Sequence, residues 1–245
     1  MDQRIAETAS LIYPEMGRLP APLQYEGEVK PWKENWRLVL TGNRSIDSCD
    51  YRVSAIFDSI RNRDWQLFVL QVGLWGGMIP GVMGKSFEKI YGVPFGQRPQ
   101  EDRFETIQNT IGLAFDALQE RHSLEGIWGT LRDELDWSAV MLSKCLHFLA
   151  RGAAWNDPVP VPIDNAMVRN WLWPEFKRIV RSRGLNWPRP AGIQGDSWES
   201  YNRYMTAIRT WAHVNGCSCM EVETALFSGW RQNSKHAPVF NSPRR

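Results

Sequence analysis

Apolar residues recur at helical spacing along most of this chain, and this periodicity constrains the fold more than any other feature of the sequence. Val53, Ile56, Phe57 and Ile60 lie on one face of an α-helix, because residues three and four positions apart face the same side. Similar spacing predicts further helices at about residues 64–73, 101–121, 123–134, 138–151, 165–182, 197–215 and 218–228. No segment alternates apolar and polar residues as a half-buried strand does. We therefore expect an all-α protein, a compact unit of about eight helices.

Proline and glycine mark the regions between the predicted helices. Residues 1–45 mix proline, tryptophan and charged residues, which favours an extended arm with at most one short helix. Glycines and a proline between residues 76 and 84 predict a turn region after the helix that Asp64 would cap. A chain of 245 residues is long enough for one large domain. We assign residues 1–45 to the arm and residues 46–245 to a helical domain.

The composition excludes several classes of protein. Hydrophobic residues make up 43% and charged residues 23%, which excludes wholesale disorder and a coiled coil. The formal net charge of +2 is too small to indicate nucleic-acid binding by itself. No apolar run reaches the roughly 18 residues of a membrane span, and the first residues lack the pattern of a signal peptide. The cysteines show no paired spacing typical of a metal site or a disulfide framework: Cys49, Cys145, Cys217 and Cys219. We expect a cytoplasmic protein with reduced thiols and no membrane partner.

One lysine lies on an apolar face of its predicted helix. Val140, Met141, Cys145 and Phe148 surround Lys144 at positions i−4, i−3, i+1 and i+4. Burial of an ammonium group disfavours its charged form and lowers its pKa, which makes a lysine a better nucleophile near neutral pH. The alternative is a lysine at the edge of the apolar stripe, whose aliphatic stem covers the stripe while its amine reaches water.

A stiff loop and an aspartate follow this helix. In the segment Pro158-Val159-Pro160-Val161-Pro162-Ile163-Asp164, alternating prolines keep the chain extended. Asp164 then stands at the start of the next predicted helix, where it is a natural N-cap. A carboxylate at this position stays ionised, because backbone N–H groups and the helix dipole favour its charged form. Asp164 is therefore either only an N-cap or a carboxylate held in place for catalysis.

Together these residues resemble a known enzyme superfamily. A lysine on a helix, a connecting loop and Pro162-Ile163-Asp164 at the start of the next helix are similar to the helix-hairpin-helix DNA glycosylases, and most of all to the 8-oxoguanine DNA glycosylase fold. The string Ser143-Lys144-Cys145-Leu146-His147-Phe148 and the run from Tyr201 to Phe227 also resemble bacterial proteins of this fold, some encoded in anti-phage defence loci. The resemblance covers roughly residues 47–230, and its specific part is residues 140–168. The family's usual Leu-x-Gly-Val-Gly-x-Lys hairpin is replaced by Val140-Met141-Leu142-Ser143-Lys144, which leaves either a different turn or a continuous helix before the lysine.

The resemblance implies a bacterial cytoplasmic DNA glycosylase with lyase activity, acting on an 8-oxoguanine-like damaged or modified purine in duplex DNA. The target base would be flipped out, since C1′ of its nucleotide cannot be reached inside the stack. Lys144 would attack C1′ and displace the base, and Asp164 would stabilise the positive charge that develops on the sugar. The resulting Schiff base would then eliminate the 3′-phosphate. The resemblance implies no cofactor and no metal.

Further residues are candidates for binding the DNA. Phe148 could form a wall of the base pocket, Trp75 could be a second flat partner and Gln71 could read a base edge, with core packing as the alternative for all three. Between residues 165 and 190, six basic residues accompany a single acid, Glu175. This excess favours a surface that follows the phosphate backbone, or equally a solvated helix face. The basic residues are Arg169, Lys177, Arg178, Arg181, Arg183 and Arg189.

Three other interpretations stay open. A monofunctional glycosylase would use Asp164 to activate water, with Lys144 holding the sugar or a phosphate. A helical DNA-binding or assembly module could keep the fold without the chemistry, which the missing hairpin glycines favour. The thirteen tryptophans could instead form a protein interface. His147 and His213 are isolated on predicted helices, so we interpret both as structural.

Overall fold

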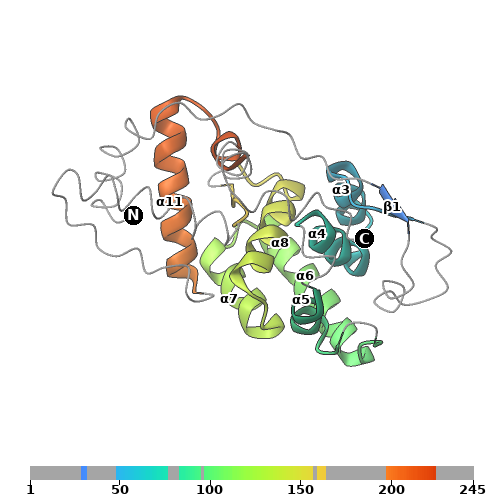
Figure 1. Ribbon diagram of the computed structural model, residues 1–245. Helices are drawn as coiled ribbons and strands as arrows, with labels where there is room; N and C mark the ends of the chain where they lie inside the picture. Colours follow the sequence, from blue (N-terminus) through green and yellow to red (C-terminus); the bar gives the residue numbers. More distant parts are fainter. Residues whose placement is uncertain are drawn as a thin grey trace. The chain divides into compact units, whose positions relative to one another are not determined.

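α-Helices make up most of the chain that the structure describes, as the apolar periodicity predicts (Figure 1). This computed structural model describes residues 29–31, 48–76, 83–94, 97–156, 159–163 and 197–224. The chain divides into two compact units, Tyr25–Pro160 and Val161–Arg245 together with Met1–Gln24. Of the predicted arm at residues 1–45, only Val29–Pro31 lies among the described residues, and the predicted helix at residues 165–182 lies outside them.

Apart from α5, the helices of the larger unit begin and end close to the predicted positions. Asp64 caps its helix as expected, because its carboxylate accepts a hydrogen bond from the Leu67 N–H at 3.2 Å. The Ser123 hydroxyl caps another helix by accepting from the Gly126 N–H at 3.1 Å. The described helices of this unit are α3 (Val53–Arg61), α4 (Trp65–Trp75), α5 (Met83–Tyr91), α6 (Glu101–Gln119), α7 (Leu124–Leu135) and α8 (Ala139–Gly152).

Helix α8 lies at the centre of the larger unit. Helices α3, α4, α6 and α7 all contact it (Figure 1). Every residue from Met141 to Ala150 is buried. The sequence predicts one apolar stripe, whereas the structure encloses the helix on all sides. The polar residues of α8 therefore need hydrogen-bond partners inside the core.

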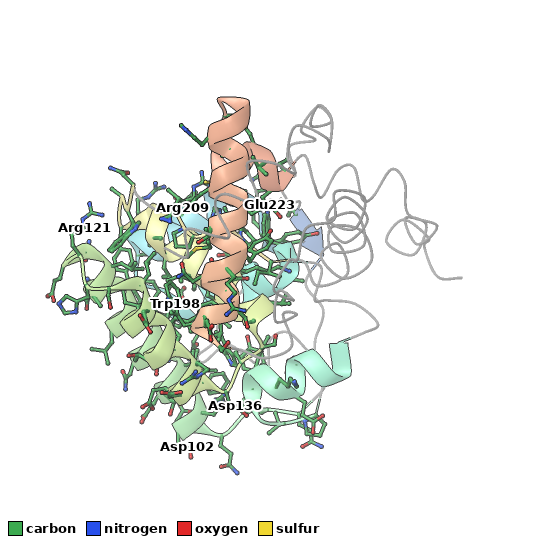
Figure 2. The ribbon with its side chains drawn as sticks, turned by 90° about the vertical axis from the view of Figure 1, so that its left-hand side faces the viewer. Asp102, Arg121, Asp136, Trp198, Arg209 and Glu223 are labelled. Carbon is green, nitrogen blue, oxygen red and sulfur yellow. The ribbon has the colours of Figure 1, made fainter. Side chains whose placement is uncertain are left out.

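Helices α6 and α7 pack along each other and carry charge at their ends. Glu101 and Asp102 stand in the first turn of α6, where negatively charged carboxylates interact favourably with the positive end of the helix dipole. Figure 2 shows Asp102 and Asp136 at one end of this helix pair and Arg121 at the other. Arg103, in the first turn of α6, donates to the carbonyl oxygen of Leu135, the last residue of α7, so the start of α6 and the end of α7 lie near each other.

Two features of the larger unit were not predicted. Strand β1 (Val29–Pro31) pairs antiparallel with β2 (Ser48–Asp50), and three-residue strands are too short to show alternation in the sequence. Helix α5 begins inside the region that the glycines marked as a turn, so that prediction is wrong from Met83 onward. Phe87, Ile90 and Tyr91 are buried and provide the apolar face that holds α5 in place.

The smaller unit contributes α11 (Trp198–Asn215), which matches the helix predicted at 197–215. Gly216 ends it in the left-handed conformation, at φ 63°. Residues 219–224 are also helical. The Ser218 hydroxyl accepts from the Glu221 N–H at 3.2 Å, and the Glu221 carboxylate accepts from the Ser218 N–H at 2.7 Å. This reciprocal capping box starts the second helix.

Candidate functional site

Lys144 occupies the second turn of α8 and is only 5% exposed. Its Nζ donates a hydrogen bond to the carbonyl oxygen of Gly76, 2.9 Å away, at the C-terminal end of α4. Carbonyl groups at this end of a helix carry partial negative charge, so they favour a cation or an N–H donor. The predicted burial of Lys144 is confirmed, and its side chain does not run along the edge of an apolar stripe.

Gly76 makes room for this lysine. A Cβ atom at Gly76 would lie 2.6 Å from Lys144 Nζ and 2.8 Å from its Cδ. Gly76 has φ −72°, which other residues adopt readily, so the backbone itself does not require glycine. Its missing side chain is instead required by the close approach of Lys144. Sequence analysis placed Gly76 only in a turn, because nothing local marks a partner 68 residues away.

The aromatic candidates Phe148 and Trp75 lie together. Their ring centroids are 5.0 Å apart with an interplanar angle of 88°, an edge-to-face contact. The ring of Phe57 packs on Phe148 at 5.9 Å. Phe148 is fully buried, whereas Trp75 is half-buried. Trp75 precedes Gly76 and Phe148 follows Lys144 by one turn, so this aromatic cluster adjoins the lysine.

Gln71 links three elements of the core. Its Nε2 donates to the carbonyl oxygen of Asp50 at 2.6 Å, and its Oε1 accepts from the hydroxyl of Ser59 at 2.7 Å. These bonds tie β2 and α3 to α4. The Gln71 amide could read a base edge only after these bonds had opened.

His147 is a buried, neutral residue three positions after Lys144. Its Nδ1 lies 2.7 Å from the carbonyl oxygen of Pro160, which can only accept, so Nδ1 carries the proton. Nε2 is then the acceptor and faces Nη1 of Arg151 at 3.4 Å. Burial lowers the pKa of His147 to about 4. This is the structural role that we predicted, and His213 is exposed on α11.

Cys145, beside Lys144 in the sequence, is also fully buried. Burial raises the pKa of its thiol, because the surrounding apolar atoms disfavour a thiolate. Cys145 is therefore a packing residue rather than a nucleophile.

The connection that precedes the lysine helix has three residues. Helix α7 ends at Leu135 and α8 begins at Ala139, so the segment from Val140 to Lys144 is continuous helix. Of the two alternatives for the segment that replaces the glycine hairpin, the structure has the continuous helix. Asp136 adopts the left-handed conformation at φ 51° that glycine usually supplies in such turns.

A second basic residue, half-buried Arg103 on α6, was not singled out from the sequence. Its Nε donates to the carbonyl oxygen of Ile90 at 3.1 Å, and its Nη2 donates to the same oxygen at 2.9 Å and to that of Leu135 at 2.7 Å. The indole N–H of Trp137 also donates to Ile90 at 3.2 Å. Partial burial lowers the pKa of Arg103, and the nearby Asp136 and Asp102 oppose this effect. Its partners are backbone atoms, which leave no signal in the sequence.

The remaining candidate residues lie outside the described residues: Asp164, Arg169, Lys177, Arg178, Arg181, Arg183 and Arg189. The structure thus brings Lys144, Trp75 and Phe148 to one region of the larger unit and places Gln71 in its core. Within the described ranges, no group of three or more His, Cys, Asp or Glu residues could hold a metal ion. No described helix is both long and apolar enough to span a bilayer.

Comparison with known proteins gives no match to a family model, to a curated protein or to a solved structure. Function must therefore be inferred from the residues themselves.

Proposed function

We propose that this protein is a DNA glycosylase with lyase activity, in which Lys144 is the nucleophile and Asp164 its acidic partner. Its substrate is a damaged or modified purine, such as 8-oxoguanine, in duplex DNA. The observation that carries the proposal is the burial of Lys144 in α8, with its amine 2.9 Å from the Gly76 carbonyl oxygen. The resemblance of residues 140–168 to this enzyme superfamily supports the same chemistry.

Burial of a lysine is unusual in a protein core and requires an explanation. Placing an ammonium group in a protein core costs free energy even when the group is partnered. Lys89 on α5 shows the ordinary arrangement, since its side chain is exposed. Residues that break the rules of core composition are concentrated where function requires them. Lys144 is such a residue, in the helix that four other helices enclose.

The surroundings of Lys144 suit a nucleophilic amine. Desolvation favours the neutral form of an amine, which keeps its lone pair available. A neutral amine can donate one N–H to the Gly76 carbonyl and direct the lone pair elsewhere, so the bond orients the nucleophile. Among the aromatic candidates, half-buried Trp75 is better placed than fully buried Phe148 to meet a flipped base.

The reaction proceeds in two stages. The Lys144 lone pair forms a bond to C1′ while the bond from C1′ to the base breaks, and the departing base nitrogen takes the electron pair and a proton. The Asp164 carboxylate stabilises the positive charge on the sugar during this step. Nζ then loses a proton, the bond from C1′ to O4′ breaks and O4′ is protonated, which leaves an imine. Loss of a C2′ proton expels the 3′-phosphate.

A specific observation favours a second candidate, a DNA-binding or assembly module without catalysis. The Gln71 amide is hydrogen-bonded inside the core, Phe148 is fully buried and the Lys144 amine is bonded to Gly76. All three side chains thus contribute to the fold. On this interpretation Lys144→Gln, whose amide can still donate to Gly76, leaves the biological activity of the protein intact.

Borohydride trapping tests the proposal. Two duplexes are incubated with the protein and sodium borohydride, one carrying 8-oxoguanine and one a preformed abasic site. Borohydride reduces an imine to a stable amine and gives a covalent protein–DNA band. The matched control is Lys89→Gln, because Lys89 is an exposed lysine of the same unit.

We expect a band with wild type and Lys89→Gln on both duplexes, and none with Lys144→Gln. A band on the abasic duplex alone would retain the lysine chemistry and change the base. No band on either duplex would contradict a lysine nucleophile. Thermal unfolding of Lys144→Gln shows whether its loss of trapping is a loss of folding.

A further inference from the structure

Arg151, in the last turn of α8, is an exposed arginine whose side chain is held from two sides. Its guanidinium lies over the ring of Phe57, with the Cζ atom 5.0 Å from the ring centroid. Its Nη1 faces Nε2 of His147 at 3.4 Å, which is the acceptor nitrogen of that neutral ring. Such contacts restrict the rotamers of a long side chain, so Arg151 loses less conformational entropy when it binds a ligand.

Arg151 shares a face of α8 with Lys144. The two residues are seven positions apart, which is two turns and about 10 Å along the helix axis. Phe148 lies between them on this face, and its ring centroid is 5.9 Å from that of Phe57. On the side of the lysine, Trp75 packs on Phe148 at 5.0 Å. A continuous row of aromatic rings therefore joins the arginine to the surroundings of the lysine.

The charges around this row of rings leave it suited to an anion. Two carboxylates flank Phe57 in the sequence, Asp50 in β2 and Asp58 in α3. Each is already paired with another arginine, Asp50 with Arg52 at 2.6 Å and Asp58 with Arg61. Phe57 and Trp75 are half-buried, so both rings present part of their surface to solvent.

Acidic residues gather instead near the start of α8. Asp136 lies three residues before the helix, and Asp102 lies at the same end of the α6–α7 pair (Figure 2). These carboxylates repel a phosphate, whereas the guanidinium near the other end of α8 attracts one. An extended anion such as a DNA strand is therefore expected to run past Lys144 towards Arg151.

We propose that Arg151 binds a backbone phosphate of the duplex on which Lys144 acts. This inference rests on the proposed function. A guanidinium presents its N–H donors in a planar fork that matches the oxygens of a phosphate. The phosphates of one strand follow one another at about 3.4 Å along the DNA axis, so a phosphate about 10 Å from Lys144 lies within about three nucleotides of the flipped one. Arg151 thus holds the strand beside the nucleotide whose C1′ Lys144 attacks.

The salt dependence of DNA binding tests this contact. The probe is a labelled duplex that carries a tetrahydrofuran abasic-site analogue, and fluorescence anisotropy gives its dissociation constant at several salt concentrations. Each phosphate that a protein cation neutralises adds about one to the slope of log K against log salt. Arg151→Gln removes the charge, whereas Arg151→Lys keeps the charge and removes the fork.

Arg121→Gln is the matched control. Arg121 is also an exposed arginine of the larger unit, and its guanidinium lies over the ring of Trp155 at 5.4 Å. Its Nη2 donates to the carbonyl oxygen of Ala154 at 3.0 Å. Arg121 therefore resembles Arg151 in exposure and in the contacts that hold it, but it follows α6 and does not share the face of α8 that carries Lys144.

We expect Arg151→Gln to weaken binding about tenfold and to lower the slope by about one. Arg151→Lys should keep the slope and lose about threefold in affinity, and Arg121→Gln should stay within about twofold with the slope unchanged. In borohydride trapping on a preformed abasic site, Arg151→Gln should match wild type at saturating duplex and be about tenfold slower at limiting duplex. This is the pattern of a lost contact that binds substrate and transition state equally.

Other outcomes overturn the inference in distinguishable ways. An unchanged slope in Arg151→Gln, with wild-type trapping intact, would refute the phosphate contact and leave the proposed function standing. Equal slope losses in Arg151→Gln and Arg121→Gln would replace the specific contact by a general attraction. Slower trapping by Arg151→Gln at saturating duplex would make Arg151 a structural residue. Wild-type protein that binds the duplex but traps no abasic site would refute the proposed lysine chemistry, whatever the slope of Arg151→Gln.

Discussion

Arg103 and Lys144 are two basic residues of the larger unit that donate hydrogen bonds to carbonyl oxygens at the C-terminal ends of helices. Arg103 reaches Ile90 in the last turn of α5 and Leu135 at the end of α7. Lys144 reaches Gly76 at the end of α4. Both follow the same electrostatic rule, since these carbonyls carry the negative end of the helix dipole.

The guanidinium of Arg103 and the amine of Lys144 differ in the chemistry that they can carry out. The guanidinium of Arg103 is a rigid fork that joins three helices, and it does not deprotonate in proteins. Asp102 and Asp136 add carboxylates beside it. Lys144 is a primary amine in helix α8, which four other helices of the unit contact. The comparison indicates that Arg103 stabilises the packing of three helices, whereas the primary amine of Lys144 can also act as a nucleophile.

The largest effect should come from replacing Arg103. Arg103→Met leaves the Leu135 carbonyl without this donor and weakens the partnering of Ile90, so we expect the free energy of unfolding to fall by about 4 kcal/mol. Lys144→Met should lower it by less than about 1 kcal/mol, because methionine fills the same space. Urea denaturation measures both, with the exposed Arg98→Met as the control. Equal losses of unfolding free energy in Arg103→Met and Lys144→Met would contradict the distinction between a structural Arg103 and a nucleophilic Lys144.

Acid should affect the region of Lys144 through His147, whereas Arg103 cannot respond in this range. Burial lowers the pKa of folded His147 from 6.5 to about 4, so the unfolded chain binds the proton first as pH falls. Stability is therefore complete above about pH 6.5 and declines towards pH 4, by about 2 kcal/mol between pH 7 and pH 5. The groups facing the ring are Arg151, the Pro160 carbonyl and Phe148.

Unfolding in urea at both pH values measures this dependence. His147→Asn should be less stable than wild type at pH 7 but should lack the acid-sensitive component. The control is His213→Asn, which changes an exposed histidine. An undiminished slope in His147→Asn would assign the acid sensitivity to other groups.

A smaller effect than that of acid should come from Gly76→Ala, which tests the space that Lys144 occupies. The added methyl group displaces the flexible end of the lysine and its bond to the carbonyl, so we expect a loss of about 1 kcal/mol. Gly129→Ala in α7 adds a methyl group into open space and should instead stabilise by about 0.5 to 1 kcal/mol. In a Lys144→Ala background, Gly76→Ala should no longer destabilise. Independent, additive effects of the two substitutions would contradict the close approach.

The sequence predicted the helices whose signals are local. Asp64 caps α4 as expected, and the apolar period of residues 101–118 is the buried face of α6. Helix α5 was missed because Gly84 lies inside it and its apolar face is short. The β1–β2 ladder was missed because strands of three residues have no detectable period.

The candidate site was predictable only in part. The four apolar neighbours of Lys144 on the helix left two alternatives, burial or a position at the edge of the apolar stripe, and in the structure Lys144 is buried. The roles of Gly76 and Arg103 depend on contacts with distant backbone carbonyls, which no pattern in the sequence reports. The edge-to-face contact of Trp75 with Phe148 likewise requires the packing of α4 against α8. The role of Asp164 stays a prediction.

The most direct test of the central claim is to locate the covalent bond. Wild-type protein is trapped with borohydride on a duplex that carries an abasic site, digested with a protease, and the modified peptide is sequenced by mass spectrometry. We predict that the reduced sugar is attached to Lys144. Attachment to another amine, such as that of exposed Lys89, would show that Lys144 is a structural residue of the core and not the nucleophile.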